Sequence, residues 1–166
     1  MLKFAFPAAA AAIALIPSAA AWASYGPDPS ACLAGSRRPA VLVTVSGFKQ
    51  RSGNVRVQIY NSRNFLVKGQ RVTRVDARVV AQSMAICVPL PGPGTYAVAV
   101  RHDVDGDNEK RDWTDGGGFS RNPKLSLLHL KPSFGEVAVP IGNAPRALTV
   151  VMNYRSGLSI GPAKRS

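Results

Sequence analysis

The feature that most constrains the fold of this chain is a succession of short segments in which apolar and polar residues alternate. In the clearest of them, Val55, Val57 and Ile59 alternate with more polar neighbours, the period of two expected of a strand with one face in water. Similar segments recur at intervals of about a dozen residues, separated by glycine and proline, and no segment outside residues 1–23 has a convincing helical pattern. About seven such strands predict an all-β fold, a single antiparallel β-sandwich of the immunoglobulin-like or prealbumin-like kind.

The strand expected at 95–102 is the strongest in the chain. Tyr96 and Val98 lie on one of its faces and Ala97 and Ala99 on the other, so we expect both faces to be covered. A corner rich in proline and glycine leads into the Gly-x-Tyr sequence at its start. This pattern is typical of sandwich domains in which the tyrosine caps a corner.

Further strands can be placed on either side of it. The strands expected at 41–45 and 55–60 should pair as a hairpin across the polar turn between them. The arginine-rich segment 71–80 should form one or two edge strands. After residue 122, strands are expected at 125–130, 134–139 and 148–154.

Residues 1–23 have the pattern of a signal peptide. Lys3 supplies a positive charge, residues 8–16 form an unbroken apolar run, and Ala21-Trp22-Ala23 offers a small-x-small cleavage site. The run is shorter than the about 20 residues that a membrane-spanning helix needs, so no transmembrane segment is expected. We therefore predict an exported protein, periplasmic or secreted. An irregular lead-in at 24–39, the sandwich domain at 40–154 and a basic tail at 155–166 would follow the signal peptide.

The chain has two cysteines, Cys32 and Cys87. In an exported protein they most simply form one disulfide bond. Such a bond would close a loop of 55 residues. The chain-entropy treatment gives a stabilisation of about 4 kcal/mol for a loop of that length. Two free buried thiols are the alternative.

Acidic residues are concentrated in one loop. Six of the nine acids fall between Asp103 and Asp115, although the formal net charge is +12. Asp103, Asp105 and Asp107 occupy alternate positions, so a tight loop can turn three carboxylates toward one point, and Asp112 or Asp115 can close the far side. Calcium takes six to eight oxygen ligands in irregular geometry. All five aspartates are therefore candidate ligands of Ca²⁺ or of another hard cation.

The same loop also has a purely structural interpretation. Aspartate and asparagine side chains accept hydrogen bonds from nearby backbone N–H groups in turns, and arginines such as Arg101 and Arg121 could neutralise the acids. The spacing is not that of an EF-hand, because Asn108 stands at the position of the required glycine and Thr114 at that of the closing acid. A loop held by its own hydrogen bonds and ion pairs remains the alternative.

Two aromatic residues, Trp113 and Phe119, flank three consecutive glycines beside this loop. A tryptophan next to acids could stack on a sugar ring, which makes both residues candidate ligand contacts. The alternative is that both cover the end of the sandwich, since aromatic side chains mostly serve burial.

The excess of basic residues outside the acidic loop limits the kinds of partner that this protein is expected to bind. Outside residues 103–115 the bases far outnumber the acids, so the remaining surface should be strongly positive. Export argues against nucleic acid as the partner. We predict a non-catalytic exported module whose acidic loop is stabilised either by calcium or by its own arginines. The alternative is binding or adhesion to an anionic polysaccharide or a membrane surface through the basic surface.

The chain lacks a recognisable catalytic set. Its only histidines are His102 and His129, and it has no Gly-x-Ser-x-Gly elbow, phosphate-binding loop or cysteine nucleophile. His102-Asp103 is similar to a pair found in metal hydrolases, but such sites need further histidines. We therefore do not expect an enzyme.

Two neighbouring segments carry a resemblance to a known family: G-T-Y-A-V-A-V-R-H-D-V-D-G-D-N-E-K-R-D at 94–112 and G-G-F-S-R-N at 117–122. With these segments the chain resembles the bacterial family called domain of unknown function 2141. The resemblance extends from about Val41 to Tyr154 and includes a closing strand that ends in tyrosine. It implies an exported all-β protein and assigns no activity. The family often has asparagine in the loop where this chain has Asp105 and Asp107, so this loop is the more acidic.

Overall fold

The structure is a computed structural model, and it describes residues 24–107 and 114–163. The expected signal peptide at 1–23 lies outside the described residues, as do 108–113 and 164–166. In the described part of the chain, no helix has the length and apolar character needed to cross a membrane.

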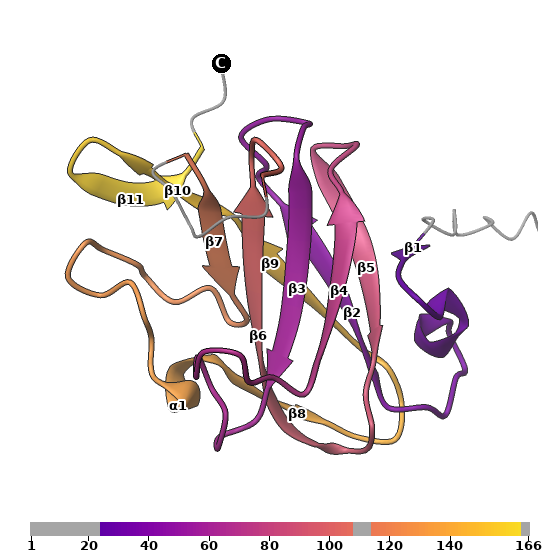
Figure 1. Ribbon diagram of the computed structural model, residues 1–166. Helices are drawn as coiled ribbons and strands as arrows, with labels where there is room; N and C mark the ends of the chain where they lie inside the picture. Colours follow the sequence, from indigo (N-terminus) through magenta and orange to yellow (C-terminus); the bar gives the residue numbers. More distant parts are fainter. Residues whose placement is uncertain (1–23, 108–113, 164–166) are drawn as a thin grey trace, which may run out of the picture.

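Two β-sheets lie one behind the other (Figure 1). In the four-stranded sheet, β5 and β2 are antiparallel, whereas β1 and β9 run parallel to their neighbours. The order of its strands is β1 (Ser24–Tyr25), β5 (Ser83–Pro89), β2 (Ala40–Ser46) and β9 (Arg146–Val151).

The second sheet has seven strands and is antiparallel throughout. Six of its strands follow the order β11 (Ser159–Pro162), β10 (Asn153–Ser156), β7 (Gly116–Phe119), β6 (Gly94–Asp103), β3 (Asn54–Tyr60) and β4 (Thr73–Arg78). The seventh, β8 (Ala138–Ile141), pairs with the first part of β6, and β7 pairs with the last part. The sandwich-like all-β fold expected from the sequence is confirmed, and the arginine-rich segment does form an edge strand, β4.

The main core lies between the sheets, because strand alternation turns one row of side chains inward from each sheet. Val57 of β3 and Val100 of β6 belong to it, together with Val43 of the facing β2. A second apolar cluster covers the outer face of the seven-stranded sheet, where Ala97 and Phe119 pack with the short helix that follows. Both faces of β6 are therefore covered, as expected.

The corner before β6 is closed by a tyrosine. The Tyr96 hydroxyl donates a hydrogen bond of 2.9 Å to the carbonyl oxygen of Gly92. This confirms the expected tyrosine cap, which ties the start of the central strand to the proline-rich turn.

The expected hairpin between the first two long strands is wrong. β2 belongs to the four-stranded sheet and β3 to the seven-stranded sheet, so the turn between them carries the chain from one sheet to the other. The valines of both strands are buried in the same core from opposite sides. Alternation shows which face of a strand is buried, but not which strand lies beside it.

The segment after the acidic loop also differs from expectation. Residues 125–130 form a tight turn with a single bridge between Ser126 and His129 rather than a strand. Residues 134–139 begin as one helical turn, α1 (Phe134–Val137), before entering β8. A capping box starts this helix, because Ser133 and Glu136 exchange hydrogen bonds between side chain and backbone.

The expected last strand, 148–154, is divided between the two sheets. β9 ends at Val151 in one sheet and β10 begins at Asn153 in the other. Met152 lies between them, fully buried in the main core. The expected inward row of alternate residues is nevertheless preserved, since Val150 and Tyr154 belong to the same core.

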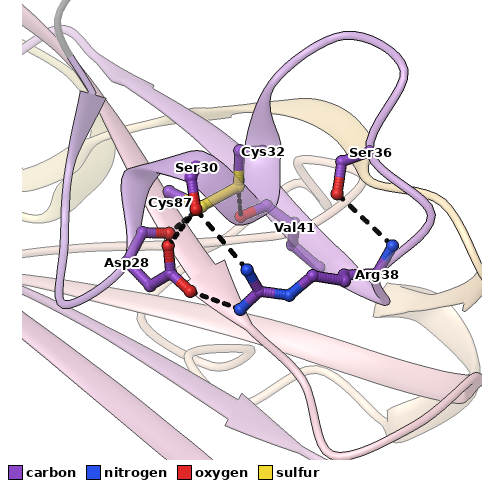
Figure 2. The surroundings of a disulfide bond; sticks show 7 residues. All are labelled: Asp28, Ser30, Cys32, Ser36, Arg38, Val41 and Cys87. Carbon is purple, nitrogen blue, oxygen red and sulfur yellow. Dashed lines mark hydrogen bonds and ion pairs between the residues drawn. A yellow bond between two sulfur atoms is a disulfide. The ribbon is translucent and has the colours of Figure 1, made fainter.

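The disulfide bond between Cys32 and Cys87 is present and ties the lead-in to β5 (Figure 2). Cys32 ends a short 3-10 helix, η1 (Pro29–Cys32). Beside the disulfide, the guanidinium of Arg38 is ion-paired with the carboxylate of Asp28. The hydrogen bond from the Ser30 hydroxyl lowers the pKa of Asp28, and the contact with Arg38 lowers it further.

Candidate functional site

The end of the β6–β7 pair brings two aspartates together. His102 pairs with Gly116 across the two strands, so Asp103 and Asp115 occupy the next pair of positions. Neighbours along a strand point to opposite faces, which sends His102 into the core and Asp103 to the outer face. Like charges directly opposite each other on two strands repel, so this arrangement needs a compensating cation.

Asp105 joins these two residues to form what we call the aspartate cluster: Asp103, Asp105 and Asp115. Each offers one carboxylate oxygen, and these three oxygens lie within 4.8 Å of one another. Asp103 and Asp115 are buried, with exposed fractions of 5% and 7%, and Asp105 is exposed. The cluster therefore has two buried members and one at the surface.

Arg101 supplies a positive charge to the cluster. Its Nε and Nη2 both donate to Oδ2 of Asp115, at 2.9 and 2.7 Å. Oδ1 of the same carboxylate accepts a hydrogen bond from the backbone N–H of Val104, at 3.3 Å. Asp115 is thus anchored through both oxygens.

The loop after β6 is shaped by its own aspartates. Oδ1 of Asp103 accepts a hydrogen bond from Gly106 N–H at 3.0 Å, and Oδ1 of Asp105 accepts one from Asp107 N–H at 3.3 Å. Gly106 has a φ of +77°, a conformation that glycine adopts at little cost. These are the turn-forming hydrogen bonds of the structural interpretation, and they hold the carboxylates of Asp103 and Asp105 in place.

The structure gathers three of the five candidate cation ligands. Asp107 is exposed and is not part of the cluster. The left-handed turn at Gly106 interrupts the regular alternation on which its inclusion depended. Asp112 lies outside the described residues.

Of the two candidate aromatic contacts, only Phe119 lies in the described part of the chain. Trp113 lies outside the described residues. Phe119 is 5% exposed and packs in the outer cluster, with its ring centroid 6.4 Å from that of Phe65. It also lines a pocket of about 270 Å³ on the outer face of the seven-stranded sheet, between β6 and the loop at 66–70.

Sequence reasoning did not reveal that His102 and Tyr154 meet in a buried polar group directly beneath the loop. His102 is fully buried, and its Nδ1 lies 2.6 Å from the hydroxyl of Tyr154 on β10. That hydroxyl accepts a hydrogen bond of 3.1 Å from the N–H of Lys49, so its own hydrogen is directed to Nδ1. The imidazole Nε2 then donates to the carbonyl oxygen of Ser52, at 2.9 Å. The sequence does place a histidine directly before the loop and a tyrosine at the end of the last expected strand, and these two residues were the signal that could have indicated the group.

Burial sets the protonation states of this group. It lowers the pKa of His102, and the hydrogen bond to the Ser52 carbonyl opposes that shift. Burial also raises the pKa of Tyr154 to about 12. A neutral imidazole and a neutral phenol fit the hydrogen bonds of both residues, so the group links three segments without a buried charge.

The donor set of the aspartate cluster fits a calcium ion. Calcium tolerates irregular geometry, whereas magnesium demands a near-ideal octahedron and gives up its water reluctantly, so carboxylates gathered from a loop suit calcium better. The three oxygens lie within 4.8 Å of one another, close enough for one ion to contact all of them. Three carboxylates supply part of the six to eight oxygens required, and backbone carbonyls or water would supply the others.

Comparisons with known proteins place the chain in a family. A family described as uncharacterized proteins conserved in bacteria (DUF2141) matches residues 43–149, which include strands of both sheets and the aspartate cluster. Neither the search of curated proteins nor the search of solved structures finds a match. The match covers more than half of the chain, and the chain therefore belongs to the DUF2141 family of uncharacterized bacterial proteins.

Proposed function

We propose that this protein is a non-catalytic, exported β-sandwich module whose aspartate cluster binds calcium. The observation that carries the proposal is the convergence of Asp103, Asp105 and Asp115, whose ligand oxygens lie within 4.8 Å. The ends of two paired strands hold two of these residues, so their approach does not depend on a long loop. Carboxylates placed this closely repel one another, and a divalent cation relieves that repulsion.

Arg101 competes with calcium for the cluster. Its guanidinium donates twice to Oδ2 of Asp115, and its side chain is only 15% exposed. One positive charge against three carboxylates leaves a negative balance among these four residues. Calcium would add two charges, and the cluster could then hold the ion and Arg101 together or exchange one for the other.

The non-catalytic part of the proposal is supported by the state of His102. Both of its ring nitrogens are engaged in the core, with Tyr154 and with Ser52. The other histidine, His129, lies in an exposed contact with Glu136. Neither histidine is presented to the aspartate cluster as a general base.

Thermal unfolding with calcium and with chelator tests the cation site. A ligand at 100 times its Kd stabilises the fold by about 2.7 kcal/mol, which corresponds to a rise in Tm of roughly 5–10 °C for a domain of this size. Asp105→Asn should remove most of this rise, because it deletes a charge but keeps the side chain's size and its acceptor oxygen.

Asp76→Asn is the matched control, since Asp76 pairs with Arg56 and Arg74 and its strand, β4, is separated from β6 by β3. It should shift the baseline Tm and leave the calcium effect unchanged. Magnesium should stabilise less than calcium. Identical melting curves in calcium and in chelator would refute the proposal.

A second candidate function is binding of an anionic polysaccharide in the pocket that Phe119 lines. Lys68 offers positive charge there, and Gln58 and Gln70 offer amide donors. Outside the loop, the described acids are already paired with basic side chains: Asp28 with Arg38, Asp76 with Arg56 and Arg74, and Glu136 with His129.

Such binding should weaken steeply with salt, because it depends on charge. Titration with an acidic polysaccharide at increasing ionic strength, for the native chain and for Lys68→Gln, measures it. Binding that is absent, or that does not respond to salt, would end this second candidate.

A further inference from the structure

A tight turn between β7 and α1 presents leucines at its tip. Ser126 and His129 close the turn with two backbone hydrogen bonds, Ser126 N–H to His129 O at 3.2 Å and His129 N–H to Ser126 O at 3.0 Å. Leu127 and Leu128 occupy its two central positions. Leu128 is fully exposed, at 101%, and the nearby Leu130 is 41% exposed.

The β10–β11 hairpin ends in a turn of similar construction. Ser156 pairs with Ser159, so Gly157 and Leu158 form a two-residue turn, with Gly157 at a φ of +59°. Leu158 is 86% exposed. The side chain of Arg155 donates to the carbonyl oxygen of Gly157 at 2.9 Å and stiffens the turn.

Leucine is out of place at these positions in water. Central residues of tight turns are usually glycine, asparagine, aspartate, serine or proline, which suit the backbone and the solvent. A single exposed leucine needs no explanation, but here the most exposed leucines of the described chain occupy the tips of two hydrogen-bonded turns. Both turns project beyond the strands on the same side of the molecule (Figure 1).

The backbone of both turns is ready for an apolar environment. Loss of water costs most where a backbone N–H or C=O group is left without a partner. In the first turn, Ser126 and His129 already satisfy each other, and in the second the Ser159 hydroxyl donates to Ser156 O at 2.8 Å. The closing residues of both turns can therefore leave water without losing these hydrogen bonds.

Basic residues surround the two tips. Arg121, Lys124 and Lys131 flank the first turn, and Arg155 stands at the base of the second. Near the first turn, the described acid Glu136 is held by Ser133 and His129. Apolar tips with a basic surround match a bilayer that has an anionic headgroup layer over an apolar interior.

We propose that the turns at Ser126–His129 and Ser156–Ser159 insert Leu128 and Leu158 into the surface of an anionic lipid membrane. A protein partner usually requires one continuous apolar patch, whereas two separate convex tips suit a fluid surface that closes around each. These turns include no residue of the aspartate cluster and none of the pocket's lining. The inference thus goes beyond calcium and polysaccharide binding.

Co-sedimentation with lipid vesicles tests the proposal. The protein is purified after export and its N-terminus determined, so that the apolar run at 8–16 does not enter the comparison. Vesicles containing phosphatidylglycerol should bind the protein, and vesicles of phosphatidylcholine alone should bind it much less. Leu128→Ser and Leu158→Ser should each weaken binding roughly tenfold, the effect of losing the burial of one leucine.

Leu33→Ser is the matched control, because Leu33 is 58% exposed but follows η1 in the lead-in, outside both turns. It should bind as the native chain does. Lys124→Gln with Lys131→Gln should weaken binding and reduce its dependence on salt.

Insertion is measured separately with tryptophan at the tip. The emission of Leu128→Trp should shift to shorter wavelength on anionic vesicles, and that of Leu33→Trp should not. The proposal is overturned if no vesicle binds the protein, or if the leucine variants bind as well as the native chain.

Discussion

Gly53 lies directly against the backbone of Asp103, so close that a Cβ at Gly53 would be 1.9 Å from the Asp103 carbonyl oxygen. The same Cβ would be 2.6 Å from the carbonyl oxygen of Val104. Ser52, the preceding residue, donates a hydrogen bond from its hydroxyl to the Val104 carbonyl at 3.1 Å. The turn between β2 and β3 thus supports the first residues of the acidic loop, and only glycine fits at this contact.

Gly53→Ala should therefore destabilise the fold strongly, by about 3 kcal/mol or more, because backbone must move to make room. Gly69→Ala is the matched control. Gly69 has a similarly positive φ, +78° against +69°, but nothing lies within 4 Å of its Cβ position. It should cost only the conformational strain, about 1 kcal/mol. Equal losses in urea unfolding would show that the contact with Asp103 does not matter.

The lowered pKa of His102 predicts how stability depends on pH. Below the ordinary value of 6.5, the unfolded chain binds a proton that the buried imidazole resists. The contribution of His102 to the free energy of unfolding should therefore be fully present above pH 6.5. It should be lost as the pH falls through 6.5 toward the lower pKa of His102 in the folded chain. The slope is at most about 1.4 kcal/mol per pH unit, for one proton. Urea unfolding between pH 7.5 and 5.5, in chelator, measures it.

The variant His102→Gln should be less stable and should lose most of this slope. His129→Gln is its control, because His129 is exposed and contacts only the surface residue Glu136 among described acids. It should keep the slope of the native chain. A slope that survives in His102→Gln would assign the proton to another group.

The strands could be predicted from the sequence because the alternation of residues such as Val55, Val57 and Ile59 reports burial directly. Their neighbours could not. β2 pairs with β5 and β9, the latter over a hundred residues away, and alternation contains no information about such pairing. The leucines at 127 and 128 misled for a related reason, since apolar residues in an exposed turn imitate a short strand.

The candidate site, too, could be predicted only in part from the sequence. Crowded acids at 103–115 indicated the loop, but the meeting of Asp103 with Asp115 depends on the register of β6 and β7. That register places Gly116 opposite His102, a position where a side chain would collide with Tyr154, since a Cβ would be 2.4 Å from its ring. The glycines after the loop therefore have a packing role, which composition alone did not reveal.

Arg101→Gln should separate the structural and the cation-binding roles of the aspartate cluster. In chelator it should lower stability by about 3 kcal/mol, because the buried carboxylate of Asp115 loses its charged partner. With calcium, the rise in Tm should be larger than in the native chain, because the ion no longer competes with the guanidinium. Arg74→Gln, which removes an exposed partner of Asp76, should change stability by less than about 1 kcal/mol and leave the calcium effect unaltered. A calcium effect that is no larger in Arg101→Gln would show that the ion and the guanidinium do not compete and that the cluster holds both together.

Removal of the disulfide should weaken the fold without changing its sheets. The bond closes a loop with a sequence separation of 55, worth about 4 kcal/mol in the chain-entropy treatment. β5, which carries Cys87, pairs with β2 over seven positions, so the four-stranded sheet should persist. The lead-in is held more weakly, since β1 pairs with β5 over only two positions.

The double variant Cys32→Ser with Cys87→Ser should therefore keep the far-ultraviolet spectrum of the native chain and unfold at a lower urea concentration. Its amide hydrogens at 24–38 should exchange faster, while those of β3 and β6 stay protected up to the reduced global stability. The native chain in reducing agent should match the double variant, which controls for the two serines. Unchanged exchange at 24–38 would mean that η1 packs against β5 and β2 firmly enough without the covalent bond.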